Sequence, residues 1–295
     1  MPKTEVMAHL GFIGTGVMGK SMAGHLIDAG HSLRIYNRTK AKAASLLEKG
    51  ARWCSSPAEV CNGADTVFTI LGYPDDVEKI YLGPQGLIKS AAPGTLLVDM
   101  TTSCPLLARR IAEAAHTQNL ETLDAPVSGG DIGAREKRLT IMVGGNEQGF
   151  QRALPHLQCL GSNIILQGPA GAGQLTKLCN QIAIAANMMG VCEAITFAQK
   201  SGLDPRQVLA SIGGGAAGSW SLQNLTPRML DGDFAPGFYV KHFIKDMRLA
   251  LDTAEAMQLK LPGLELAHRL YKQVADQGGG DDGTQALFKY YQARF

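Results

Sequence analysis

The sequence predicts an α/β fold, in which an N-terminal doubly wound parallel sheet is followed by an all-α C-terminal domain. Three observations predict it. Short apolar runs alternate with helical patterns in the first half, a glycine-rich turn follows the first of these runs, and strand patterns stop near Gly168. We therefore expect a sheet domain over residues 1–168 and a helical domain over 169–295, entered by a long interdomain helix.

The expected strands are short and rich in aliphatic and β-branched residues. They are Leu10–Ile13, Leu33–Tyr36, Thr66–Leu71, Thr95–Asp99, Thr122–Asp124, Thr140–Val143 and Ile164–Leu166. Helical patterns lie between several of them, such as Met18–Ala29 and Lys40–Lys49. Because parallel strands need a crossover connection, usually a right-handed helical one, this alternation predicts βαβ units.

Helical patterns dominate the second half of the chain. They are Gln174–Ser201, Pro205–Ile212, Val240–Met257, Pro262–Gln277 and a shorter one at Thr284–Arg294. Two glycine-rich loops, Gly213–Gly218 and Gly278–Gly283, separate some of them. The first of these helices would be about 40 Å long at 1.5 Å per residue, which is enough to leave the first domain and cross the second.

Composition and charge exclude several classes of protein. Hydrophobic residues make up 45% and charged residues 18% of the 295 residues, which is typical of a globular protein. The net charge of +2 argues against nucleic acid or a membrane surface as the main partner. The six cysteines form no CxxC pair and no histidine pair has zinc-ligand spacing, so we expect no metal, and free thiols in a reducing cytoplasm.

Two segments could be mistaken for membrane or targeting signals. Met1–His9 has no long apolar run behind basic residues, so no signal peptide is expected. The most apolar stretch, Ile182–Ala198, contains Asn187 and Glu193. A membrane span of about 20 residues is usually free of such groups, so this stretch is expected to be a buried helix.

The glycine-rich turn carries the first functional signal. Gly14-Thr15-Gly16-Val17-Met18-Gly19 follows an expected strand and opens an expected helix. In GxGxxG turns of this kind, the first glycine allows the tight turn, the second admits a pyrophosphate to the backbone, and the third lets helix and strand pack closely. The pyrophosphate then lies at the positive end of the helix. The turn predicts a dinucleotide-binding Rossmann domain.

The end of the second expected strand indicates which dinucleotide is bound. An NAD site usually has Asp or Glu there for the ribose hydroxyls, whereas this chain has Asn37-Arg38-Thr39-Lys40. Arg38 can form bidentate bonds to a 2′-phosphate, and Asn37, Thr39 and Lys40 can add donors. We therefore expect NADP(H) to be preferred. The alternative is that Arg38 stacks on adenine and Asn37 holds the ribose, which would allow NAD(H).

Four motifs, in order along the whole chain, resemble those of a known family. They are Phe12–Met22, Asp124–Gly130, Gly171–Gln181, and Phe234–Phe238 followed by Ile244–Asp246. The chain is similar in all four to the β-hydroxyacid dehydrogenases, which include 3-hydroxyisobutyrate dehydrogenase, tartronate semialdehyde reductase and the succinic semialdehyde/glyoxylate reductases.

The resemblance implies one general acid/base, Lys177, one turn into the long helix at the junction of the two domains. Its neighbours in sequence are neutral, and we expect desolvation, the nicotinamide charge and Lys245 to lower its pKa. The implied substrate ligands are Ser128, Gly129, Gly130, Asn180 and Gln181. The implied cofactor ligands, beyond the glycine turn and Asn37-Arg38-Thr39, are Leu71, Gly72, Thr101, Thr102 and Lys245.

The chain departs from the family pattern at three places. Gln181 stands where many members have Asn, and the Asn180-Gln181 pair is more similar to the tartronate semialdehyde reductase branch. Gly72 stands where many members have Pro, so the backbone path there is open. The charged stretch Arg135–Arg138 follows the substrate loop, and we expect it to be solvated.

These observations together predict a reversible hydride transfer between NADP(H) and a short β-hydroxyacid or semialdehyde. The expected partner is a small carboxylate substrate, with no nucleic acid and no membrane, in a cytoplasmic homodimer or homotetramer. One alternative is a non-catalytic dinucleotide-binding scaffold. Another is an imine reductase-like enzyme on the same fold, against which Lys177 argues, because the resemblance implies that such enzymes replace this lysine. Which hydroxyacid or semialdehyde is the substrate is left open.

Overall fold

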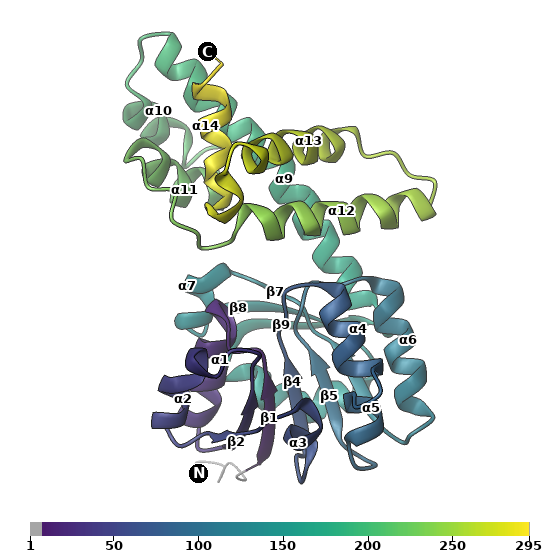
Figure 1. Ribbon diagram of the computed structural model, residues 1–295. Coiled ribbons are helices and arrows are strands. Elements are labelled where there is room, and N and C mark those ends of the chain that lie inside the picture. The colour runs from purple at the N-terminus through teal and green to yellow at the C-terminus, as the bar shows by residue number, and fades with distance from the viewer. Residues whose placement is uncertain (1–7, 295) are drawn as a thin grey trace. The chain divides into compact units, whose positions relative to one another are not determined.

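The computed structural model describes residues 8–294, which form two compact units divided between Lys177 and Leu178. Figure 1 shows the sheet with its helices in the first unit and the helices of the second. The expectation that Met1–His9 is no signal peptide concerns a segment that lies almost entirely outside the described residues.

The first unit is built on one sheet, in which the described strands are ordered β3-β2-β1-β4-β5-β6-β8-β7, with β9 beside β8. The strands are β1 His9–Ile13, β2 Ser32–Tyr36, β3 Arg52–Trp53, β4 Thr66–Thr69, β5 Leu96–Asp99, β6 Glu121–Asp124, β7 Val127–Ser128, β8 Leu139–Gly144 and β9 Gly161–Gly168. Strands β1 to β6 are parallel, as the sequence predicts.

The sheet reverses direction after β6, so the parallel sheet expected from the sequence also contains antiparallel pairs. Strand β8 is antiparallel to both β6 and β7, and β9 then runs parallel to β8. The short connection from β7 to β8 explains the reversal: it holds only the six-residue helix α7, Gly130–Arg135. A parallel crossover needs a dozen or more residues, so the chain returns antiparallel.

Helices cover both faces of the sheet, which confirms a doubly wound domain. Alternate residues of the central strands enter different cores, so that Phe12 and Phe68 lie in one and Ile13 and Val67 in the other. The first core is closed by α1 Val17–Asp28, α2 Ala44–Glu48, α7 and α8 Glu147–Gln158. The second is closed by α3 Pro57–Cys61, α4 Pro74–Leu82, α5 Leu87–Ser90 and α6 Pro105–His116. A 3₁₀ turn, η1 Lys40–Ala43, leads into α2.

The second unit is helical, as expected, and has a core of its own around Met188, Phe243, Tyr271 and Phe288. Its helices are α9 Ala172–Lys200, which begins in the first unit, α10 Pro205–Ile212, α11 Trp220–Leu230, α12 Val240–Ala256, α13 Pro262–Asp276 and α14 Leu287–Gln292, with 3₁₀ turns η2 Gly279–Asp281 and η3 Thr284–Ala286. Helix α11 is not predicted by the sequence pattern.

Helix α9 is long and apolar enough to cross a membrane, by length and composition only. Half of its most apolar 18-residue window is nevertheless buried in the fold. Met188, Cys192 and Ile195, for example, lie in the core of the second unit. This is the pattern of a core helix with one covered face.

Candidate active site

The glycine turn after β1 has the geometry that a dinucleotide loop requires. Gly14 has φ +99°, and a Cβ there would overlap the carbonyl oxygen of Ile70. A Cβ at Gly19 would overlap the carbonyl oxygen of Gly14, so this glycine permits the close approach of α1 to the turn. By contrast, a Cβ at Gly16 would meet no atom within 4 Å. Space is therefore open beside Gly16 and closed around the other two.

The start of α1 also fits a bound pyrophosphate. The Thr15 hydroxyl oxygen is buried and has no hydrogen-bond partner among the described residues. Helix α1 begins at Val17, and Gly16 provides no side-chain cap for its first N–H groups. Unsatisfied N–H groups and the helix dipole together attract an anion. The residues present therefore fit a dinucleotide cofactor at this turn.

Asn37 joins the glycine turn to the end of β2. Its Oδ1 accepts from the Thr15 N–H at 3.1 Å, and its Nδ2 donates to the Thr39 carbonyl at 2.9 Å. Arg38 next to it is 78% exposed and forms an ion pair with Asp76 of α4 at 3.2 Å. The strand end itself has no carboxylate, but the fold brings one to Arg38 from a helix about 40 residues later, which sequence reasoning missed.

The loops after β4 and β5 are held together by side chains of the β5 end. Leu71 N–H donates to the Thr101 hydroxyl at 2.8 Å. Asp99 accepts from the Thr69 hydroxyl at 2.8 Å and from the Thr101 N–H at 3.1 Å. Burial raises the pKa of Asp99 to about 6, and hydrogen bonds from Thr101 and Thr69 act against that rise. Gly72 and Thr102 each follow directly in these two loops.

The substrate loop predicted at Ser128–Gly130 runs from the end of β7 into α7. Gly129 has φ +127° and Gly130 has φ +63°, a backbone that residues with a Cβ rarely adopt. His25 of α1 ties α7 in place, because its Nε2 lies 2.9 Å from the Ala134 carbonyl oxygen and 3.1 Å from that of Arg135. The predicted substrate loop is thus fixed to the helix that follows the glycine turn.

The charged stretch Arg135–Arg138 is exposed. Arg135 pairs with Asp131 at 2.7 Å, and Arg138 pairs with Glu136.

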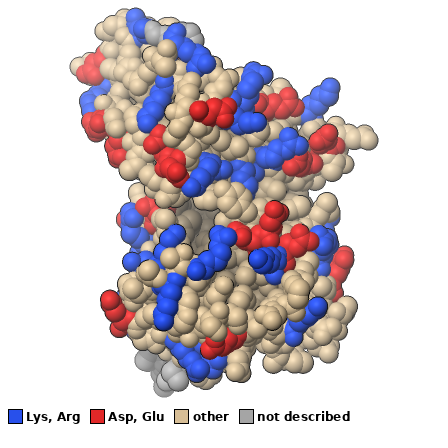
Figure 2. All heavy atoms as spheres, viewed as in Figure 1, with Lys and Arg blue, Asp and Glu red and all other residues tan. Residues whose placement is uncertain are grey.

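In the described part of the chain, no group of three or more His, Cys, Asp or Glu side chains could hold a metal ion. Figure 2 shows acidic and basic side chains interspersed over the visible face.

Asp124, at the end of β6, fixes the start of α9. It accepts from the Gly171 N–H at 2.7 Å and from the Gln174 N–H at 2.8 Å. Burial raises the pKa of Asp124 to about 6, and these N–H bonds act against that rise. A Cβ at Gly173 would overlap the carbonyl oxygens of Asp124 and Met142, so the first turn of α9 lies directly against β6 and β8. Lys177, which is buried, follows one turn later on the same helix.

The other predicted polar residues lie in the second unit and are joined through Asp246. Asn180 Nδ2 donates to Gln181 Oε1 at 2.8 Å, and Gln181 Nε2 donates to Asp246 Oδ2 at 2.5 Å. Lys245 Nζ lies 2.9 Å from Asp246 Oδ1. Gln181 and Asp246 are each 1% exposed, so the lysine charge balances a buried carboxylate.

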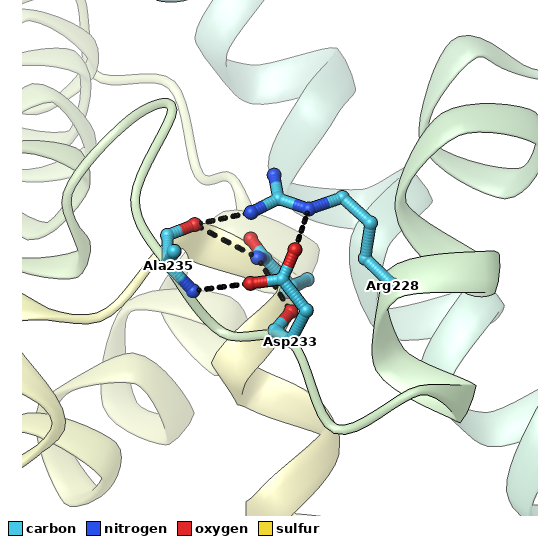
Figure 3. A network of polar contacts seen from close by, with 4 residues as sticks. Arg228, Asp233 and Ala235 are labelled. Atoms are coloured by element: carbon cyan, nitrogen blue, oxygen red, sulfur yellow. Dashed lines mark hydrogen bonds and ion pairs between the residues drawn. The ribbon is translucent and has the colours of Figure 1, made fainter.

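The loop with the late motif, Phe234–Phe238, is anchored by two residues that sequence reasoning missed. Figure 3 shows Arg228 donating to Asp233 at 2.8 Å and to the Ala235 carbonyl at 2.6 Å, while Ala235 N–H donates back to Asp233 at 2.9 Å. Gln285 Nε2 donates to the carbonyls of Asp233 and Ala235 at 3.1 and 3.2 Å. Gln285 is separated from these two partners by 52 and 50 positions, so no local sequence pattern pairs them.

Comparison with known proteins adds the family. Residues 9–168 match the family model described as the NAD binding domain of 6-phosphogluconate dehydrogenase. Residues 171–291 match the model described as NAD-binding of NADP-dependent 3-hydroxyisobutyrate dehydrogenase. The chain belongs to the β-hydroxyacid dehydrogenase family.

Relatives along the full chain agree with this assignment. An uncharacterised oxidoreductase of Bacillus subtilis (strain 168) is 57% identical over 96% of this chain and 98% of its own. The 2-hydroxy-3-oxopropionate reductase of Escherichia coli (strain K12) is 40% identical over 94% of this chain and 95% of its own. A solved structure of Mycobacterium tuberculosis 3-hydroxyisobutyrate dehydrogenase with L-serine has a TM-score of 0.89 at 32% identity, and covers 98% of this chain and 100% of its own.

These findings confirm the resemblance and the fold class expected from the sequence. The chain has an NAD(P)-binding Rossmann domain followed by a helical domain, and it is an oxidoreductase of this family rather than a non-catalytic scaffold.

Proposed function

We propose that this enzyme catalyses reversible hydride transfer between NADP(H) and a short β-hydroxyacid or its semialdehyde. The family supports this class of reaction, and relatives named for 2-hydroxy-3-oxopropionate and for 3-hydroxyisobutyrate mark its range. The observation that carries the proposal is Lys177, a lysine on a helix whose first turn is fixed to the cofactor domain through Asp124.

Lys177 is the general acid and base in this proposal. In the reducing direction, the lysine ammonium gives a proton to the carbonyl oxygen of the substrate as the carbonyl carbon becomes C–H, so that the product is a hydroxyl group. In the oxidising direction, the neutral amine removes the hydroxyl proton. The bound cofactor supplies or accepts the hydride.

The substrate carboxylate is held by Ser128, Gly129 and Gly130, with Asn180. The positive φ angles of Gly129 and Gly130 turn backbone N–H groups in a way that suits an anion. Of the two amides on α9, Gln181 is 1% exposed and donates to Asp246, whereas Asn180 is half-buried and donates to Gln181. We therefore give Asn180 the contact to substrate and Gln181 a supporting role.

NADP(H) is the preferred cofactor in this proposal. Arg38 supports it, because a guanidinium matches the geometry of a 2′-phosphate and its exposed ion pair with Asp76 is weak enough to exchange. The decisive measurement is the ratio of kcat/KM for NADPH and NADH, and a preference for NADH would contradict this part of the proposal.

We further propose that the enzyme acts in the cytoplasm, as a homodimer or homotetramer, with neither nucleic acid nor membrane as partner. The six cysteines are free, which suits a reducing compartment. Phe197 of α9 is 72% exposed, and a second copy could cover it. Light scattering coupled to size exclusion measures the assembly, and a monomer at micromolar concentration would contradict it.

The principal test is Lys177→Ala, assayed by NADPH absorbance against tartronate semialdehyde, succinic semialdehyde and glyoxylate. We expect kcat to fall by about 10²- to 10⁴-fold, while the Kd for NADPH stays within about threefold. Near-normal turnover in the variant would remove Lys177 from the mechanism. Wild-type activity on a cyclic imine, without activity on any semialdehyde, would favour the imine reductase alternative.

A further inference from the structure

Gln174 connects α9 to the loop after β5 through both ends of its side-chain amide. Its Oε1 accepts from the Ser103 N–H at 2.8 Å, and its Nε2 donates to the Thr101 carbonyl at 2.8 Å. The residue is 0% exposed. These two backbone groups flank Thr102, so the amide pairs with the loop much as a neighbouring strand would.

The backbone of Gln174 is fixed as firmly as its side chain. Its N–H donates to Asp124 at the end of β6, at 2.8 Å. The carbonyl of Thr101 accepts from the Gln174 side chain, and the hydroxyl of Thr101 accepts from the Leu71 N–H in the loop after β4. Gln174 therefore links the loop after β5 to the end of β6 directly, and reaches the loop after β4 through Thr101; these three strands are adjacent and parallel.

This linkage leads directly to the residues that the proposed mechanism uses. Lys177 follows Gln174 by three positions on α9, so both side chains project from the same side of the helix.

The two hydrogen bonds of the Gln174 side chain require glutamine at this position. Asparagine is shorter by one methylene and could not span the same gap. Leucine has a similar size but no polar atoms, and would leave a buried donor and a buried acceptor unpaired.

We propose that Gln174 is a positioning residue, which sets the place of Lys177 relative to the Thr101–Ser103 loop and so aligns the proton donor with the reacting carbonyl. It touches neither substrate nor cofactor and acts through Thr101, Ser103 and the first turn of α9. The inference rests on the proposed function for the role of Lys177.

The test compares Gln174→Leu, Gln174→Glu and a control at an exposed glutamine, Gln223→Leu. Gln223 of α11 also donates its amide to a backbone carbonyl, that of Gly213, at 2.7 Å, but it lies in the second unit. In Gln174→Leu we expect kcat to fall about 10- to 100-fold, with KM and the Kd for NADPH changed much less, because a small misplacement of a proton donor affects mainly the chemical step. Gln223→Leu should keep its kcat.

Gln174→Glu gives a readout that a merely structural role would not produce. A protonated carboxylic acid has one donor and one acceptor, like the amide, whereas the carboxylate cannot donate to the Thr101 carbonyl. The kcat of this variant relative to wild type should therefore rise at least about tenfold as the pH falls and the acid becomes protonated. The corresponding ratio for Gln174→Leu should not change with pH.

Hydrogen exchange of the cofactor-free protein separates this inference from the proposed function. In Gln174→Leu the Ser103 amide should exchange at least about tenfold faster, because it has lost its acceptor. Unchanged exchange, or faster exchange with an unchanged kcat, would overturn the positioning role. If instead wild type turns over no substrate of the panel, the proposed function fails, and the exchange result alone decides whether Gln174 holds the loop.

Discussion

Two buried aspartates organise the candidate site without belonging to its chemistry. Asp99 and Asp124 face each other in the register of β5 and β6 and end these strands. Each carboxylate accepts hydrogen bonds from backbone N–H groups: Asp99 accepts from Thr101, and Asp124 accepts from Gly171 just before α9. Burial raises the pKa of both to about 6, yet backbone N–H bonds favour their ionised forms. Their role is to order the loops that carry the predicted ligands.

The ion pair between Arg38 and Asp76 makes a prediction about cofactor choice. Asp76→Asn removes a carboxylate that competes with a 2′-phosphate for the guanidinium. Because exposed pairs contribute about 0–1 kcal/mol, the kcat/KM ratio of NADPH to NADH should rise by up to about fivefold. Asp75→Asn is the control, since it removes an equal charge from the neighbouring exposed position. If the ratio of kcat/KM for NADPH to NADH rose equally in Asp76→Asn and Asp75→Asn, the effect would come from the change in net charge and not from the ion pair with Arg38.

At the scale of residues, the sequence predicts best where one residue type is required by its own backbone. Gly14 and Gly19 of the turn after β1 are such a case, because a Cβ at either position would overlap a backbone carbonyl oxygen. Asp76, Arg228 and Gln285 are the opposite case. Asp76 and Gln285 have partners 38 to 52 positions away, and Arg228 is five positions from Asp233 across the end of α11, which the sequence pattern does not predict, so only the fold reveals these contacts.

At the scale of elements, the contact between the first turn of α9 and the sheet leaves no room for an added Cβ. In Gly173→Ala the added Cβ would overlap two carbonyl oxygens, and neither β6 nor β8 can move aside without breaking its ladder. We expect a loss of about 1–3 kcal/mol in the free energy of unfolding, measured by urea denaturation.

Gly190→Ala is the matched control on the same helix. A Cβ at Gly190 meets no atom within 4 Å, so alanine should stabilise α9 by about 0.5–1 kcal/mol through its better helix propensity. If both variants changed stability alike, the close approach of α9 to the sheet would not be the cause.

Elements differ in how well the sequence predicts them for physical reasons. Helix α10 has the bounds expected, because Asp204 caps it through the Arg206 N–H and Pro205 opens it. Helix α11 was missed: a glycine-rich loop precedes it and Pro227 lies inside it, and both are signals of irregular structure. Strands β3 and β7 have two residues each, too few to show a period, and exist only through their neighbours.

At the scale of the whole molecule, buried titratable groups couple stability to pH in opposite directions. Burial raises the pKa of Asp99 and Asp124 to about 6, so between their ordinary pKa and pH 6 the folded state binds more protons than the unfolded state. Acidification through that range therefore increases the free energy of unfolding from these two groups. Burial lowers the pKa of His156 from 6.5 to about 4, which has the opposite effect.

The contribution of His156 can be isolated with His156→Phe. The ring lies edge-on to Phe68, with centroids 6.2 Å apart, so phenylalanine keeps a similar shape and removes the titrating group. Between pH 6.5 and 4 the unfolded wild type binds a proton at His156 that the folded protein excludes. Wild type therefore loses stability on acidification, and the variant lacks the contribution of His156 to that loss.

The stability of the variant relative to wild type should rise on the order of 1 kcal/mol from pH 7 to pH 4.5. This is less than the full pKa shift implies, because the half-buried ring keeps part of its hydration. Urea denaturation followed by the fluorescence of Trp53, which lies in the same unit, measures this difference. Titrating groups distant from position 156 cancel in it, because both proteins share them. A difference that stays constant with pH would show that His156 is protonated equally in the folded and unfolded states.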